Sequence, residues 1–134
     1  MPTFEDPAAD ADEAQTALRA LAHATRSIDD PRQIYSVLGS LTSPVASLSQ
    51  SLHQLAAFHD SATSGVWVAG DSRAGRAETY QVSWELHRAG EMLRQIGECI
   101  ANAHNAESRI TYVHRDFPDF ADPAHRSPDR GLSL

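Results

Sequence analysis

The feature that most constrains the fold of this chain is a repeat in its second half that alternates spacings of four and three residues. The repeat runs through Val82, Leu86, Ala89, Leu93, Ile96, Ile100, Ala103, Glu107 and Ile110, and Met92, Cys99 and Ala106 widen it on one flank. A helix gathers such positions on one face, whereas a strand changes face at every residue. The spacing therefore predicts one long helix over about 72–108, roughly 55 Å in length.

Shorter repeats of the same period precede it. The first predicts a helix over 12–26 and runs through Ala14, Ala17, Leu18, Leu21 and Ala22. Asp30 and Pro31 suit the start of a second, short helix over 31–38, and Gly39 suits its end. Ser43 and Pro44 then predict the start of a helix over 44–60, whose repeat runs through Leu41, Val45, Leu48, Leu52, Leu55 and His59.

These elements predict an all-α fold, an antiparallel bundle of three or four helices with a long C-terminal helix. Residues 1–10 are acidic and contain proline, so we expect a flexible N-terminus. The bundle domain is expected to cover 11–110. Three prolines follow Thr111, so residues 111–134 are expected to form a flexible tail.

The predicted helix over 44–60 is only about half as long as the one over 72–108. Residues 12–38 can cover the rest of the long helix within one chain, or a second chain can cover it. We expect a homodimer or a helical protein partner. Gly90 and Gly97 lie on one helix face and allow another helix to approach closely. The predicted interaction residues are Leu86, Leu93, Ile96, Gly97 and Ile100.

The amino-acid composition limits which binding partners and which cellular compartment we expect. All 11 basic residues are arginine, which is typical of GC-rich genomes such as those of actinobacteria, and the net charge is −7. That charge repels phosphate groups, so we expect no direct nucleic-acid binding and no binding to anionic membranes. Cys99 is the only cysteine, and the sequence begins without the basic and apolar regions of a signal peptide. A cytoplasmic protein is expected.

The sequence carries no catalytic motif that we recognise. It lacks a nucleophile elbow, a phosphate-binding loop and a dinucleotide fingerprint. Metal ligands on one helix need spacings of three, four or seven, and the nearest candidate, His87 with Glu91, has no second pair to complete a site. We therefore expect a protein that is not an enzyme and that binds neither metal nor cofactor.

Two short patterns resemble a known family. Trp67 and Gly70 lie between two predicted amphipathic helices, and Tyr112 and Asp116 follow the second. The layout over about 44–116 resembles the Trp-x-Gly helical-hairpin substrates of type VII secretion, although the turn here is one residue longer. The resemblance implies that Trp67 and Gly70 form the turn, that Tyr112 and Asp116 form the export signal, and that the protein is secreted without a signal peptide.

The chain also resembles small uncharacterised helical proteins of actinobacterial mobile elements. The segments that carry this resemblance are YSVLGSL, YQVSWELHRAGEML and AHNAESRITY. It implies an accessory role in conjugation or nucleic-acid processing and transfers no functional residue.

The function expected from the sequence is that of a non-catalytic helical scaffold or adaptor, which acts by self-association or by docking a partner. A secreted helical-hairpin effector and an accessory protein of a conjugation complex are the alternatives.

Overall fold

The computed structural model of this chain describes residues 1–60 and 73–115. Three helices account for most of them: α1 (Pro7–Ala24), α2 (Gln33–Asp60) and α3 (Arg73–Glu107). Over these two ranges the structure contains no strand. The fold is therefore all-helical, as the spacing predicts. None of the helices in the described ranges is both long and apolar enough to span a membrane.

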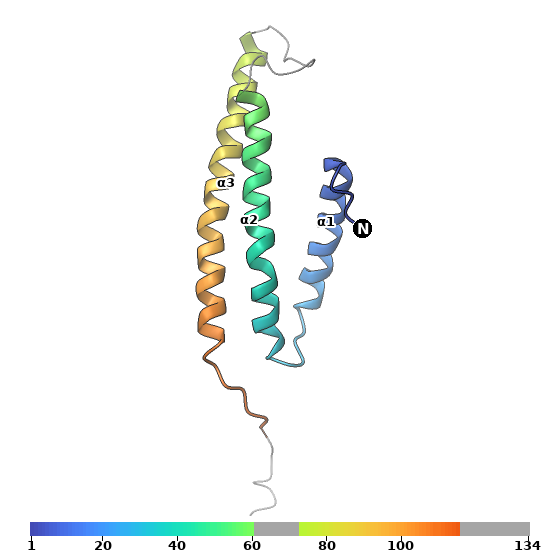
Figure 1. Cartoon of the computed structure of the whole chain (residues 1–134), viewed down its shortest axis with the longest axis vertical. Coiled ribbons are helices and arrows are strands. Elements are labelled where there is room, and N and C mark those ends of the chain that lie inside the picture. The colour runs from blue at the N-terminus through green and yellow to red at the C-terminus, as the bar shows by residue number, and fades with distance from the viewer. Residues whose placement is uncertain (61–72, 116–134) are drawn as a thin grey trace, which may run out of the picture.

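Helices α2 and α3 form an antiparallel hairpin, and α1 stands apart from it. Figure 1 shows α2 and α3 side by side along most of their length, with α1 beside α2 on the side away from α3. The principal contact between helices is that of α2 with α3. No residue of α1 is buried. The predicted arrangement of a complete bundle is thus realised only in the α2–α3 pair.

The long C-terminal helix agrees with the prediction to within one residue at each end, since α3 contains 35 residues from Arg73 to Glu107. Its last turn unwinds through bonds of shorter span, such as the one that the Arg109 amide donates to the Ala106 carbonyl at 3.0 Å. The chain then continues in extended form to residue 115.

The prediction of separate helices over 31–38 and 44–60 is wrong. One helix of 28 residues, α2, runs through Gly39 and contains Pro44 in its interior. An interior proline removes one backbone hydrogen bond and costs about 3 kcal/mol in an isolated helix. Leu38, Leu41 and Val45 are all half-buried, so packing on both sides of the proline offsets this cost. Because α2 is this long, the expected length mismatch with α3 is mostly absent.

The start of α1 also differs from the prediction, because α1 begins at Pro7 and not near Asp12. The Asp6 carboxylate accepts hydrogen bonds of 3.1 Å from the amides of Ala8 and Ala9. The proline that follows this cap needs no amide partner at the first helical position. An aspartate followed by proline thus opens α1 inside the segment that was expected to be flexible.

Replacement of Pro44 by alanine tests whether α2 is strained at this position. Alanine restores an amide hydrogen that can bond to the Ser40 carbonyl, so we expect Pro44→Ala to raise the free energy of unfolding by about 1–3 kcal/mol. Urea denaturation followed by circular dichroism measures the change. Pro7→Ala is the control, because a proline at the first helical position costs nothing of this kind. A destabilised Pro44→Ala protein would contradict the continuous helix.

Candidate functional site

Helix α3 meets α2 through a column in which small and polar residues are interspersed with leucine and isoleucine; we call it the inner seam. All members are buried or half-buried. The inner seam consists of Thr79, Ser83, Leu86, Gly90, Leu93, Gly97, Ile100 and His104. Their spacing alternates four and three, which is the repeat by which two helices pack side by side.

Two glycines in this contact make room for histidines of the facing helix. A Cβ atom on Gly90 would lie 2.7 Å from Nε2 of His53, and one on Gly39 would lie 3.0 Å from Nε2 of His104. The His104 ring also stacks on Tyr35, with ring centroids 4.1 Å apart. Each histidine therefore occupies space that a side chain at the opposing glycine would need.

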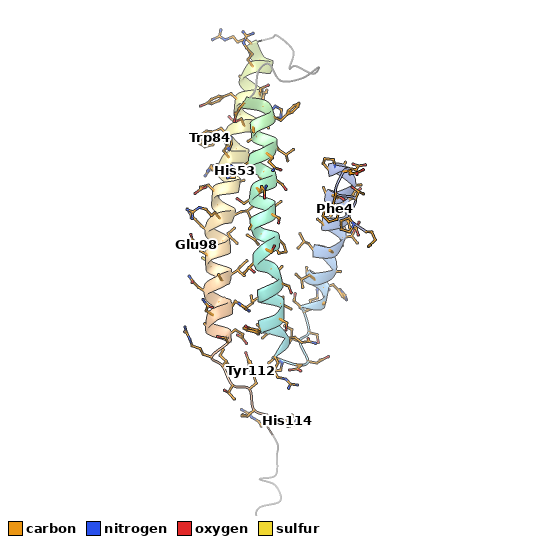
Figure 2. All side chains as sticks on the ribbon, viewed as in Figure 1. Phe4, His53, Trp84, Glu98, Tyr112 and His114 are labelled. Carbon is orange, nitrogen blue, oxygen red and sulfur yellow. The ribbon has the colours of Figure 1, made fainter. Side chains whose placement is uncertain are left out.

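A chain of polar contacts joins the two helices and starts at His53 of α2, which is labelled in Figure 2. Nδ1 of His53 lies 2.8 Å from Nδ1 of His87, and Nε2 of His87 lies 2.8 Å from Oδ2 of Asp60. The Ser83 hydroxyl donates to Oδ1 of the same carboxylate. The His53–His87 bond needs one ring to donate and the other to accept, so it is lost when both rings are doubly protonated.

The order of these groups favours a structural role for them. Ser83 is only 7% exposed, and its hydroxyl donates to Asp60 and not to an imidazole. A nucleophilic serine needs a base that takes its proton, and here the carboxylate separates the serine from the histidine. No group of three or more histidine, cysteine or acidic side chains within residues 1–60 and 73–115 is placed to hold a metal ion.

A second column on α3 is apolar and remains uncovered; we call it the outer stripe. Met92 is 53% exposed, Ile96 is 46% exposed, and the Cys99 thiol is exposed beside them. The outer stripe consists of Val82, Ala89, Met92, Ile96, Cys99, Ala103, Ala106 and Ile110. These positions repeat every seven residues in two offset sets, just as the inner seam does. Helix α3 thus has two neighbouring columns with this repeat, and α2 covers one of them.

The outer stripe borders a hollow of about 420 Å³ between the two helices. Its lining includes Leu38 of α2 and Met92, Ile96, Cys99, Ile100 and Ala103 of α3, and no residue of α1. Helix α1 instead meets α2 near its own C-terminal end, where Leu21 lines a second hollow with Val37 and Leu41. The first helix therefore leaves the outer stripe open.

The structure divides the residues predicted to mediate interaction between these two faces. Leu86, Leu93, Gly97 and Ile100 lie half-buried in the inner seam, within the same chain, and Ile96 lies on the outer stripe. A Cβ on Gly90 would clash with the His53 ring, so Gly90 does allow α2 to approach closely, whereas a Cβ on Gly97 would make only an ordinary contact with Val45. That these residues bind another chain stays a prediction.

Of the residues implied by the resemblance to secretion substrates, only Tyr112 is within the part of the chain that the structure describes. Trp67, Gly70 and Asp116 lie outside it. The Tyr112 hydroxyl donates to Oε1 of Glu107, and this hydrogen bond raises the pKa of Tyr112 above its ordinary value.

Comparison with protein-family models, with curated proteins and with solved structures gives no match for this chain. The arguments below therefore rest on the geometry of the hairpin.

Two alanine substitutions test the inner seam as a matched pair. A Cβ at Gly90 would displace the His53 ring, so we expect Gly90→Ala to lower the free energy of unfolding by about 1–3 kcal/mol. A Cβ at Gly97 would lie 3.6 Å from Cγ1 of Val45, an ordinary contact. Gly97→Ala should raise the free energy of unfolding by about 0.5–1 kcal/mol through helix propensity. Urea denaturation measures both. Equal effects would show that His53 does not require the glycine.

The Asp60 carboxylate makes the stability of the hairpin depend on pH in the acid range. Hydrogen bonds from Ser83 and His87 hold the pKa of Asp60 below its ordinary value of 3.8. A pKa lowered by folding stabilises the folded state above the unfolded pKa, and the contribution is lost as the pH falls through the folded pKa.

We therefore expect the urea midpoint of the native chain to fall more steeply below about pH 4 than that of Asp60→Asn. Unfolding curves recorded between pH 2 and pH 6 measure the difference. Asp12→Asn, on the exposed surface of α1, controls for the loss of one charge. Parallel curves for Asp60→Asn and the native chain would refute a role for this carboxylate.

Proposed function

We propose that this protein is a non-catalytic helical scaffold or adaptor that binds a partner through the outer stripe of α3. The observation that carries the proposal is the exposure of an apolar column beside a contact face that α2 already occupies. Within the described residues, Ala56 is the only apolar side chain that is fully buried. Several large apolar side chains of the hairpin, among them Met92 and Ile96, are thus exposed.

The energetic gain from covering the outer stripe supports this proposal. Burial of apolar surface contributes about 25 cal/mol per Å², and contiguous apolar patches on a folded protein commonly mark interaction sites. The stripe occurs on the longest helix, where side chains are held in a regular row. A partner helix can pack against such a row with little loss of conformational freedom in this chain.

The opposite side of α3 has a different character. Trp84 and Glu98 lie on the side of α3 away from α2 (Figure 2). The Arg88 guanidinium lies over the Trp84 ring, 5.3 Å from its centroid, and Arg94 pairs with Glu91 and Glu98 at 2.8 Å. This surface already satisfies its charges by contacts along the helix, so the proposed binding face is the outer stripe.

A secreted helical hairpin is the second candidate function. It is favoured by one observation, that α2 and α3 form an antiparallel hairpin and Tyr112 follows α3 directly. The resemblance covers only the hairpin of α2 and α3, so it does not account for α1.

Site-specific photo-crosslinking in the host cell tests the proposal. We expect a benzophenone amino acid at position 96 to form adducts of higher mass, because Ile96 lies within the binding face. The matched control is the same amino acid at position 84, since Trp84 is 49% exposed and Ile96 is 46% exposed on the same helix.

Denaturing gels of irradiated cells and medium measure the adducts and their location. Absence of adducts at both positions, or equal adducts at both, would refute docking through the outer stripe. Accumulation of the chain in the medium would support the secreted alternative.

A further inference from the structure

We infer that the outer stripe takes a second copy of this chain, with the two α3 helices antiparallel, so that two hairpins form a four-helix assembly. This inference rests on the proposed function and names the occupant of its binding face. Three features of α3 support it: the length of the stripe, its symmetry, and the position of its single charged residue.

The stripe is too long for α1 to cover. Its helical part, from Val82 to Ala106, spans about 36 Å, whereas the 18 residues of α1 span about 27 Å. The apolar row of α1 also consists mainly of alanine. A helix of the length of α3 matches the stripe, and a second copy supplies one.

The centre of the stripe is complementary to itself when reversed. A two-fold axis between Gly97 and Glu98 maps the six stripe residues from Ala89 to Ala106 onto one another, whereas Val82 and Ile110 at its ends have no partner in the stripe. The reversal places large residues opposite small ones: Met92 faces Ala103, and Ile96 faces Cys99. Alternation of large and small side chains is the arrangement by which facing helices fill the space between them.

The same reversal accounts for the one charged residue that interrupts the row. Glu85 lies seven residues before Met92, at a position that continues the repeat of the outer stripe, and it is the only charged residue at the positions of this repeat between Val82 and Ile110. In its own chain it lies 3.7 Å from a guanidinium nitrogen of Arg88. The reversal places it opposite position 110 of the second copy, beyond the end of α3 at Glu107, so Glu85 lies at the edge of the contact and keeps Arg88 as its partner.

Cys99 reports on this assembly directly, because it is the only cysteine and lies close to the two-fold axis. The two Cys99 residues would be three positions apart along the helix axes, or about 4.5 Å. We expect a short bis-maleimide to join two native chains within minutes. The control, Cys99→Ser with Asn105→Cys, moves the thiol to another exposed face of α3 and should not be joined.

Two further variants, both carrying Cys99→Ser, define the orientation. In the antiparallel assembly Met92→Cys faces Ala103→Cys, so a mixture of the two chains should be joined and either chain alone should not. In a parallel assembly each chain alone would be joined and the mixed product would not form. That outcome would overturn the antiparallel arrangement.

Sedimentation equilibrium measures dimer formation without a crosslinking reagent. We expect Ile96→Glu to weaken the dimer at least about tenfold and Trp84→Glu to leave it unchanged, with both variants retaining the native circular dichroism. A native chain whose mass stays at 14.6 kDa at tens of micromolar would refute the dimer. If photo-crosslinks at position 96 then persist at other masses, docking stands and only the identity of the partner is wrong.

Discussion

The close contact between α2 and α3 governs the rest of this structure. Two helices share a single interface, so any residue not on that interface stays at the surface. The interface is built around glycine and serine on α3, which lets the Gly90 backbone approach the His53 ring of α2. The Ser49 hydroxyl donates to the Gly90 carbonyl at 2.7 Å, a bond that a bulkier seam would not permit. Leu86, Leu93 and Ile100 pack in the same contact, whereas Met92 and Ile96 lie outside it, on the outer stripe.

The polar groups in the interface fix the alignment of the two helices. An apolar seam with a seven-residue repeat can pack equally well after a shift of one repeat. The contacts that join His53, His87, Asp60 and Ser83 exist in only one alignment, because each needs its partner within hydrogen-bonding distance. The stacking of His104 on Tyr35 imposes the same alignment near the other end of the hairpin. The network thus selects one alignment of α2 with α3. His87 and Asp60 are partly exposed, which reduces the free-energy cost of removing their polar groups from water.

The spacing of apolar residues predicted where the helices lie in the sequence. It did not predict which side chains of each helix face the other helix. Apolar spacing defined α3 to within one residue, because the repeat is sustained from Val82 to Ile110 and leaves little choice. The same reasoning divided α2 at Gly39 and Pro44, where a local preference for a break is weaker than packing against α3. The histidine contacts were missed because ligand spacings were sought within one helix, and His53 and His87 meet across two. A glycine opposite a histidine marks His53, which faces Gly90, and His104, which faces Gly39; His87 has no such signal.

The distribution of side chains between the two faces of α3 gives the strongest reason to expect a further contact. Beside its glycines and serine, the inner seam contains Leu86, Leu93 and Ile100, whereas the outer stripe contains Met92 and Ile96 beside several alanines. Each face therefore carries large apolar side chains at the spacing by which helices pack, although α2 covers only the inner seam. In the proposed assembly a second helix covers the outer stripe, and the apolar surface buried there adds to that of the hairpin. Because the centre of the outer stripe maps onto itself when it is reversed, an identical chain is the partner that we propose for it.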